Sequence, residues 1–288
     1  MSRVLVTGGL GFIGSHLVEA LMQEGHDLTV MDNLCSESSS RDYQRDGVTY
    51  WIDDVRNINT YRYQQDAAQG FDVIYHLAAL ARIQPSFKDP LKYISIDAWG
   101  TANVLEFARA AEAKVVYAGS SSAYGGEMLN PYAFAKHTGE RTCEMYSQVY
   151  GLSTVIARFF NVYGDRQPTS GPYATVVGVF QQQYSDGNSL TITGTGEQRR
   201  DFTHVSDIVS GFKALGQREW NSEIFQLGTG ENYSINELAT MFGGDVEYIQ
   251  KRPGEAWSTL ADYTEMREAT GWDPQVNLEM YVRKFVES

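Results

Sequence analysis

The feature that most constrains the fold is a glycine-rich turn that follows the first apolar run, within residues 4–14. Its glycines, Gly8, Gly11 and Gly14, stand three residues apart. This spacing allows a tight turn, close approach of the backbone to a pyrophosphate, and close packing of a helix on a strand. The helix beyond such a turn presents free N–H groups to a phosphate. The pattern predicts a strand–turn–helix unit that binds a dinucleotide, and a purely structural unit is the alternative.

An acidic residue follows at the distance that such a unit requires. The second apolar run, residues 28–31, leads into Asp32. A carboxylate roughly 20 residues beyond the turn usually binds the ribose hydroxyls of the adenosine. Because a negative charge at that point would repel a 2′-phosphate, the sequence favours NAD over NADP as the cofactor.

Strand-like and helix-like segments alternate through the first half of the chain. We expect strands at residues 3–7, 27–32, 48–52, 71–77, 114–119 and 153–158, and helices near 12–24, 91–112 and 131–150. This alternation indicates an α/β fold, a Rossmann doubly wound parallel sheet with right-handed crossovers.

Glycines and prolines interrupt this alternation after about residue 160. We expect residues 1–160 to form the NAD-binding Rossmann domain. Residues 161–288 would form mainly a smaller, irregular C-terminal lobe that binds the substrate and is interleaved with the first domain. Short strands are expected there at residues 190–193 and 224–227.

Composition excludes several classes of protein. The formal net charge of −13 argues against a nucleic-acid partner, which needs a basic surface. No apolar run approaches the roughly 20 residues that cross a membrane, and no leader-like segment precedes the first strand. The two cysteines, Cys35 and Cys143, form no C-x-x-C pair, which suits a reduced compartment and gives no indication of a metal site. We therefore expect a cytoplasmic protein with no membrane, nucleic-acid or metal partner.

A tyrosine and a lysine stand four residues apart at the start of a predicted helix. Asn130 is a favourable N-cap and Pro131 suits the first helical turn, so Tyr132 and Lys136 lie on one helical face. A tyrosine hydroxyl has a pKa near 10. A neighbouring ammonium and the positive nicotinamide of NAD+ would lower the pKa of Tyr132, which would make it a general base and acid. The alternative is an ordinary amphipathic helix.

A serine cluster within residues 117–125 follows the apolar run 114–117. The carboxyl ends of parallel strands are where open α/β sheets bind their ligands. A hydroxyl there, such as that of Ser120, can hydrogen-bond the substrate oxygen that gains or loses a proton. A serine-rich turn without a chemical role is the alternative.

Together these residues resemble the extended short-chain dehydrogenases/reductases, in the NAD-dependent sugar-nucleotide epimerase/dehydratase family. Within it, the chain is most similar to the UDP-glucose and UDP-N-acetylglucosamine 4-epimerases. The resemblance runs from residue 4 to about 278, and the motifs keep the family's order: residues 7–14, Asp32, 54–57, 76–79, the serine cluster, Tyr132 with Lys136, 158–164, 196–205 and 252–255.

The resemblance implies roles for individual residues. Ser120, Tyr132 and Lys136 match the catalytic positions. The positions that match cofactor-binding residues are Gly8, Gly11, Phe12, Ile13, Gly14, Asp32, Asn33, Asp54, Val55, Leu77, Ala78, Ala79, Tyr132, Lys136 and Phe159. Those that match substrate-binding residues are Ser120, Ser121, Asn161, Arg200, Arg252, Glu255 and Thr259. Arginine forks suit phosphate oxygens, and a surface salt bridge is the alternative for Arg200 or Arg252 taken alone.

The serine cluster narrows the reaction. Dehydratases of the family resemble T-D-E at this point and UDP-glucuronate decarboxylases resemble T-S-E, whereas this chain has Ser120, Ser121 and Ser122. The absence of a carboxylate favours NAD-dependent 4-epimerisation of a UDP-hexose through a transient 4-keto sugar. The alternatives are another sugar-nucleotide epimerase, a dehydratase, a decarboxylase or a 4-keto reductase of the same family, and a non-catalytic NAD-binding sensor.

Several positions differ from the family's pattern. Only eleven residues separate Ser120 from Tyr132, a shorter loop than relatives carry, and Asp97 replaces the usual asparagine. Thr259 matches a gate position where 4-epimerases restricted to the smaller sugars have a bulky tyrosine. We therefore expect UDP-GlcNAc and UDP-GalNAc to be accepted as well as UDP-Glc and UDP-Gal. The resemblance also implies a homodimer, paired through the helices near 101–112 and 131–150.

Overall fold

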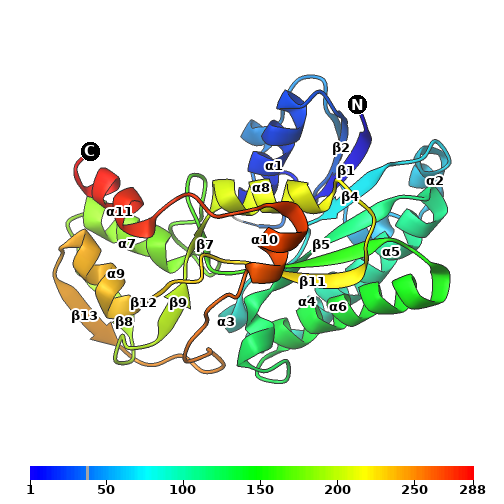
Figure 1. Ribbon diagram of the computed structural model, residues 1–288. Helices are drawn as coiled ribbons and strands as arrows, with labels where there is room; N and C mark the ends of the chain where they lie inside the picture. Colours follow the sequence, from blue (N-terminus) through cyan, green and yellow to red (C-terminus); the bar gives the residue numbers. More distant parts are fainter. Residues whose placement is uncertain (37–38) are drawn as a thin grey trace.

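The computed structural model describes residues 1–36 and 39–288 (Figure 1). Its main body is a seven-stranded sheet, with every neighbouring pair parallel, in the order β11-β6-β5-β4-β1-β2-β3. The expected Rossmann α/β fold is therefore confirmed. The strands are β1 (Arg3–Thr7), β2 (Asp27–Met31), β3 (Thr49–Trp51), β4 (Val73–His76), β5 (Lys114–Ser120), β6 (Thr154–Phe159), β7 (Val162–Tyr163), β8 (Leu190–Thr193), β9 (Arg199–Asp201), β10 (Thr203–His204), β11 (Asn221–Leu227), β12 (Asn232–Ser234) and β13 (Val246–Ile249).

Helices cover both faces of this sheet (Figure 1). The α-helices are α1 (Phe12–Gln23), α2 (Tyr61–Ala67), α3 (Ile83–Lys88), α4 (Pro90–Tyr93), α5 (Gly100–Ala111), α6 (Pro131–Tyr150), α7 (Val176–Ser185), α8 (Val205–Leu215), α9 (Ile235–Phe242), α10 (Thr264–Thr270) and α11 (Leu278–Val286). Short turns of other helical types are η1 (Arg41–Tyr43), η2 (Val55–Asn57), η3 (Ile94–Trp99) and η4 (Ser121–Gly125).

Successive side chains of a strand point to opposite faces of the sheet, so the core consists of one cluster on each face. Val4 and Val6 of β1 pack in one cluster with side chains of α1 and α8, such as Leu17 and Phe212. Leu5, which points to the other face, packs with α5 and α6. Strands buried on both faces read as continuous apolar runs, and this is why the sequence located them closely.

The expected helix near 91–112 is one continuous helical stretch of three parts. Asp89 caps α4 by accepting a hydrogen bond from the Lys92 N–H group, and Pro90 occupies the first helical position. A π-helical turn, η3, then joins α4 to α5. π-helical turns are rare and occur often at functional sites; this one contains Asp97, which is buried.

The second half of the chain passes back and forth between two parts of the molecule. Its own core joins α7, α9 and α11 to β8 through buried residues that include Phe180 and Phe242. In contrast, β11 pairs with β6 at the edge of the main sheet, and α8 packs beside α1 (Figure 1). The cavity described below lies between these two parts of the chain. None of the helices in residues 1–36 and 39–288 is long and apolar enough to span a membrane.

Candidate active site

The glycine turn between β1 and α1 has the shape that a phosphate site needs. Gly8 has a φ of +74°, and a Cβ on it would stand 2.8 Å from the Ala78 nitrogen. A Cβ on Gly14 would stand 2.1 Å from the Gly8 carbonyl oxygen. Neither position therefore accepts a side chain. Gly11 precedes α1, whose first turn has neither a side-chain cap nor an acidic residue, so its free N–H groups remain available to an anion.

Asp32 follows β2 and is only 6% exposed. Its Oδ2 accepts a hydrogen bond from the Leu10 N–H group at 3.0 Å, and its Oδ1 accepts one from the Leu34 N–H group at 2.8 Å. Burial raises the pKa of Asp32, and these two hydrogen bonds partly oppose the rise. The carboxylate thus ties β2 to the glycine turn while it lines the cavity, where its remaining lone pairs can accept ribose hydroxyls.

The residues expected to hold the adenine ring fall into two groups. One group lines the cavity, and the other is Asp54, whose carboxylate is bound by neighbouring side chains. Asn33 and Val55 line the cavity, as does Asp53. The Asp54 carboxylate instead accepts a hydrogen bond from Asn33 Nδ2 at 2.9 Å and pairs with Arg56 at 2.8 Å. Asp54 is not among the described residues that line the cavity, and its carboxylate is held by Asn33 and Arg56.

The three catalytic candidates meet where β5 ends against α6. Ser120 is the last residue of β5, and the Tyr132 hydroxyl donates a hydrogen bond to Ser120 Oγ at 3.2 Å. Lys136, one turn further along α6, is buried with its Nζ 4.2 Å from the centre of the Tyr117 ring. Asn130 caps the helix by accepting a hydrogen bond from the Ala133 N–H group at 2.8 Å. The predicted helix start, which brings Tyr132 and Lys136 to one face, is confirmed.

Burial dominates the electrostatics of this group. It raises the pKa of Tyr132 to about 12, and the hydrogen bond to Ser120 opposes the rise. Burial also lowers the pKa of Lys136, and the carboxyls of Asp97 and Glu140 oppose that fall. Lys136 is not among the main causes of the pKa shift of Tyr132, so the lowered pKa expected from the ammonium and the nicotinamide together stays a prediction. The positive nicotinamide of NAD+ remains as a source of such lowering.

His76, which begins the motif 76–79, is a structural residue. Its imidazole lies between Thr7 Oγ1 at 2.7 Å and Thr101 Oγ1 at 3.0 Å, and it is 1% exposed. Burial lowers the pKa of His76 to about 3. The imidazole is therefore neutral at physiological pH and joins β1, β4 and α5 beneath Leu77 and Ala78, which line the cavity.

The second half of the chain supplies the opposite wall. Asn161 has a φ of +28°, and its Nδ2 donates hydrogen bonds to the Asp201 carbonyl at 3.0 Å and to Thr259 Oγ1 at 3.3 Å. Thr259 is 6% exposed and lines the cavity. Its small side chain leaves open the space that a larger residue would occupy.

Two arginines expected to hold the substrate differ in how they are fixed. Arg200 donates a hydrogen bond to the Arg199 carbonyl at 2.8 Å, and its Nη2 lies 3.7 Å from Glu255 Oε2. Burial lowers the pKa of Arg200, and Glu255 opposes the fall. Arg252 is exposed and lines the same cavity.

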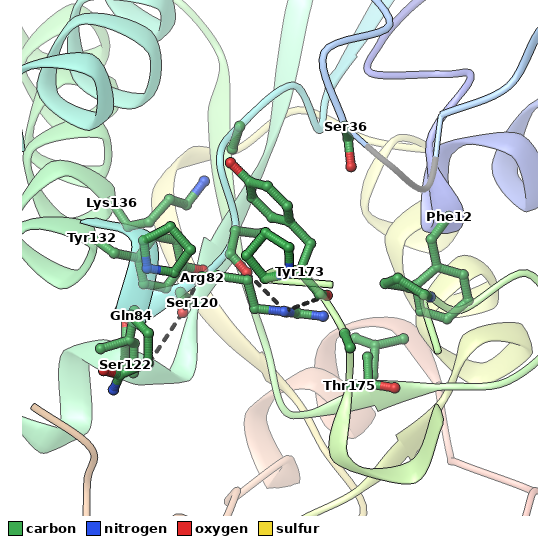
Figure 2. Close-up of a pocket in the computed structure, with 18 of the residues that line it drawn as sticks. Phe12, Ser36, Arg82, Gln84, Ser120, Ser122, Tyr132, Lys136, Tyr173 and Thr175 are labelled. Carbon is green, nitrogen blue, oxygen red and sulfur yellow. Dashed lines mark hydrogen bonds between the residues drawn. The ribbon is translucent and has the colours of Figure 1, made fainter. Parts of the chain in front are cut away.

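These side chains surround one cavity of about 1130 Å³, part of which is shown in Figure 2. The predicted residues that line it are Gly8, Gly11, Phe12, Ile13, Gly14, Asp32, Asn33, Val55, Leu77, Ala78, Ala79, Ser120, Ser121, Tyr132, Lys136, Phe159, Asn161, Arg200, Arg252, Glu255 and Thr259. Pockets for one small ligand measure roughly 300–1,000 Å³, so this cavity has room for a dinucleotide and a second ligand.

Sequence reasoning missed several residues of the cavity wall, chiefly Arg82, Gln84, Tyr173 and Thr175. Figure 2 shows Arg82 in the centre of the view, between the Ser120–Tyr132 pair and Tyr173. The available signal was a single arginine in the segment 77–83, which is otherwise apolar and directly follows a buried strand. A cation in such a segment indicates a ligand or a buried partner.

Comparison with known proteins agrees with this geometry. Residues 4–228 match the model of the NAD dependent epimerase/dehydratase family. The chain is 31% identical to a putative UDP-glucose 4-epimerase of Methanocaldococcus jannaschii, over 98% of this chain and 97% of that one. It is 30% identical to UDP-glucuronic acid decarboxylase 1 of Xenopus tropicalis, over 99% of this chain and 71% of that one.

Solved structures resemble the whole chain. The UDP-glucose 4-epimerase of Thermotoga maritima, solved with UDP-glucose, has a TM-score of 0.91 at 29% identity and covers 99% of this chain and 97% of its own. The UDP-glucuronic acid 4-epimerase of Bacillus cereus, solved with UDP-glucuronic acid and NAD, has a TM-score of 0.88 at 26% identity and covers 99% of both chains.

The glycine turn that admits no Cβ, the uncapped start of α1 and the buried Asp32 together fit a dinucleotide. The family match covers most of the chain, and the relatives include epimerases and a decarboxylase of sugar nucleotides. The protein is therefore an enzyme of the NAD-dependent sugar-nucleotide epimerase/dehydratase family, and its cofactor is NAD.

Proposed function

We propose that the protein catalyses the 4-epimerisation of a UDP-hexose. The observation that carries the proposal is the hydrogen bond from Tyr132 to Ser120 Oγ beside the buried Lys136, in a serine cluster that has no carboxylate at residues 120–122. Such a site can remove the proton from one hydroxyl of the substrate and later return it to the same oxygen. It lacks the additional acid that elimination of water or loss of a carboxyl group uses in relatives with T-D-E or T-S-E.

The proposed roles follow from the chemistry of each group. Bound NAD+ would supply the acceptor for a hydride from C4 of the sugar, and its reduced form would supply the hydride to the opposite face of the 4-keto sugar. Tyr132, as the phenolate, takes the proton of the 4-hydroxyl and later returns it, while Ser120 donates a hydrogen bond to the same oxygen. Lys136 anchors the nicotinamide ribose, and its charge favours the phenolate once the cofactor is in place.

The substrate is proposed to be held by its diphosphate, so that the 4-keto sugar can turn between the two hydride transfers. Arg200 and Arg252 provide cations for phosphate oxygens, and Asn161 provides an amide beside them. Glu255 orients Arg200 through their ion pair. The buried Thr259 leaves room for an N-acetyl group, so UDP-GlcNAc and UDP-GalNAc are proposed substrates together with UDP-Glc and UDP-Gal.

Product analysis by NMR tests the proposal directly. Purified protein is incubated with UDP-Glc, UDP-GlcNAc and UDP-GlcA separately, without added cofactor. We expect the corresponding galacto-epimer, because NAD is regenerated in each cycle and stays bound. A keto sugar would identify a dehydratase, a pentose would identify a decarboxylase, and stoichiometric consumption of NAD(P)H would identify a reductase. The Tyr132→Phe variant, which keeps the ring but lacks the proton carrier, should lose epimerisation by a factor of at least about 100.

The sequence left a non-catalytic NAD-binding sensor as an alternative, and both the family match and the site disfavour it. Such a sensor has no need for a hydrogen-bonded tyrosine and serine beside a buried lysine, and all three groups are present here. Unchanged sugar nucleotides in every NMR incubation, with NAD bound at full occupancy, would favour the sensor.

A further inference from the structure

Arg82 is fixed in the cavity by two backbone carbonyls. Its Nε donates a hydrogen bond to the Tyr173 carbonyl at 2.7 Å, and its Nη1 donates one to the Ala81 carbonyl at 2.8 Å (Figure 2). These contacts join the segment after β4 to the segment before α7. They hold the guanidinium plane in one orientation, since two of its nitrogens are engaged at once.

The charge of Arg82 has no protein partner. In residues 1–36 and 39–288, no carboxylate lies within ion-pair distance of its guanidinium, and Nη2 donates no hydrogen bond to a protein acceptor. The other arginines drawn into the interior are paired: Arg158 with Glu140, and Arg200 with Glu255. Burial lowers the pKa of Arg82, and the causes that oppose the fall are tyrosine hydroxyls only. Arg82 is half-buried and lines the cavity. Because charged side chains drawn out of water are normally paired, a cation held there without a protein anion indicates an anionic group on a ligand.

The position of Arg82 indicates which part of a ligand that anion is. Leu80, two residues before Arg82, packs in one cluster with Tyr93, Tyr132 and Tyr173. Since Arg82 Nε is bound to the Tyr173 carbonyl and Arg82 lines the same cavity as Tyr132, Arg82 lies at the Tyr132 end of the cavity. The proposed diphosphate site, with Arg200 and Arg252, is formed by the second half of the chain. The cofactor pyrophosphate has its own site at the uncapped start of α1. The anion beside Tyr132 is therefore a group on the sugar itself.

We propose that Arg82 binds a carboxylate at C6 of the hexose, so that the preferred substrate is a nucleotide-linked hexuronate. The inference rests on the proposed function, in which Tyr132 serves the oxygen on C4. C6 is attached to C5, the direct neighbour of C4, so a carboxylate there lies within a few ångströms of the reacting oxygen. The free edge of a planar guanidinium matches a carboxylate better than it matches the neutral 6-hydroxyl of glucose.

The serine cluster fits the same substrate. Ser121 and Ser122 line the cavity next to Ser120, and Ser122 Oγ is buried without a hydrogen-bond partner. A buried hydroxyl of this kind can donate to an additional oxygen of the ligand. Since none of the three serines is an acid, the carboxylate of the substrate meets hydrogen-bond donors and no repelling charge there.

Ligand binding tests the inference independently of turnover. Calorimetry is carried out on the NAD-loaded Tyr132→Phe protein, which cannot epimerise its ligand, with UDP-glucuronate and UDP-glucose. We expect UDP-glucuronate to bind at least about tenfold more tightly, since a charged hydrogen-bonded pair contributes on the order of 10- to 100-fold. Equal affinity of this protein for the two ligands would by itself overturn the inference, before any variant of Arg82 is measured.

Variants of Arg82 test whether this side chain causes the difference in affinity between UDP-glucuronate and UDP-glucose. Arg82→Gln in the same background should bring the two affinities together, and Arg82→Lys should restore part of the difference. Arg283→Gln on α11, where the side chain is 78% exposed and paired with Glu287, should keep the wild-type preference. An equal loss of affinity for both ligands would assign Arg82 to the diphosphate instead, and loss of bound NAD would assign it to the cofactor. Either result would contradict the inference.

The NMR incubations separate this inference from the proposed function. If UDP-glucose is epimerised while UDP-glucuronate binds no better than UDP-glucose, the inference fails and the proposed function stands. If neither compound is epimerised but the carboxylate preference depends on Arg82, the binding assignment holds and the proposed reaction fails.

Discussion

At the residue scale, the most unusual group is Asp97, a buried carboxyl in η3 at a position where the family resemblance leads us to expect asparagine. Its Oδ1 accepts a hydrogen bond from the Leu80 N–H group at 2.8 Å, whereas its Oδ2 is buried without a partner. Burial raises the pKa of Asp97 to about 7, and the nearby Lys136 opposes the rise. We therefore expect the carboxyl to change its charge near neutral pH, close to Lys136.

The pH dependence of stability should reveal this group. Because the folded pKa of about 7 lies above the unfolded value near 3.9, the native state binds more protons between these pH values. Stability should therefore fall as pH rises from 4 to 7, by at most about 1.4 kcal/mol per pH unit, and then level off. Asp97→Asn lacks this contribution, so its gain in stability over the wild type should grow over that range.

Chemical denaturation at pH 5 and pH 8 measures this difference. The exposed Asp262 is a matched control, since hydrogen bonds from Thr264 lower the pKa of its carboxyl and keep it ionised at both pH values. Asp262→Asn should therefore show the same stability change at pH 5 and pH 8. A stability change of Asp97→Asn that is equal at both pH values would contradict the assignment.

Thr259 is expected to decide which neutral sugars enter. It is 6% exposed beside Asn161, and its hydroxyl lies 3.3 Å from the Asn161 amide. Thr259→Tyr would fill the cavity next to the sugar, so kcat/KM for UDP-GlcNAc should fall at least about tenfold while that for UDP-Glc changes much less. The conservative Thr259→Ser is the control and should retain both activities. Equal losses for both sugars would show that the residue does not act as a gate.

At the element scale, α6 matters most because it carries both Tyr132 and Lys136. A buried ion pair fixes this helix on the sheet: Arg158 of β6 donates to Glu140 of α6 at 3.0 and 2.6 Å. Glu140 is 3% exposed, and a Cβ on Gly119 would stand 2.9 Å from its Oε1. The absence of a side chain at Gly119 is thus what allows the carboxylate to reach across β5 to Arg158.

Breaking this pair should destabilise the protein far more than breaking a surface pair. Arg158→Ala leaves the Glu140 carboxylate buried without its partner, which costs about 3–5 kcal/mol. Arg141→Ala removes an arginine of the same helix that is 65% exposed and paired with Glu144, and this should cost less than about 1 kcal/mol. Urea denaturation of both variants makes the comparison. Similar losses in the two would show that the Glu140–Arg158 pair has no special role.

At the scale of the whole molecule, the exposed face of α6 is the candidate for contact with a second copy of the chain. Phe134, Met145, Val149 and Tyr150 are 39%, 41%, 63% and 54% exposed on this helix, and Trp99 beside α5 is 64% exposed. The spacing of Phe134, Met145 and Val149 brings these three to one side of α6, and exposed apolar side chains that group in this way indicate an interaction site. The resemblance to the family makes a homodimer through α5 and α6 the natural proposal.

Light scattering coupled to size-exclusion chromatography tests the dimer. The wild type should elute with twice the chain mass of 32.2 kDa, and Val149→Glu should shift it toward the monomer, because a charge would be buried at the interface. Met280→Glu places the same charge on α11, at a side chain that is 73% exposed, and should leave the dimer intact. A monomeric wild type would rule out the proposed assembly.

Local geometry explains how much of the fold and the site could be predicted from the sequence. The glycine turn, Asp32 and the pair Tyr132–Lys136 depend on spacing along one strand or one helix, and such spacing is set by the backbone alone. The central strands β1, β4, β5 and β6 were located closely because both of their faces are largely buried, which favours apolar runs. The edge strand β11 is more exposed, and only its last residues, 224–227, were expected. These features could be predicted since no distant part of the chain is needed to define them.

Only the tertiary structure decided the features that depend on contacts between distant segments. It placed β11 at the edge of the main sheet, bound the Asp54 carboxylate to Asn33 and Arg56, and brought Arg82 into the same cavity as Tyr132. Burial by distant segments also raises the pKa of Tyr132 to about 12, an effect that the spacing along the helix does not reveal. Burial and long-range pairing determine all of these, and neither is encoded in the local order of residues. The sequence alone therefore determined the fold class, the cofactor and the placement of Tyr132 and Lys136 on one face of a helix, while the packing of the two halves determined the shape and charge of the cavity.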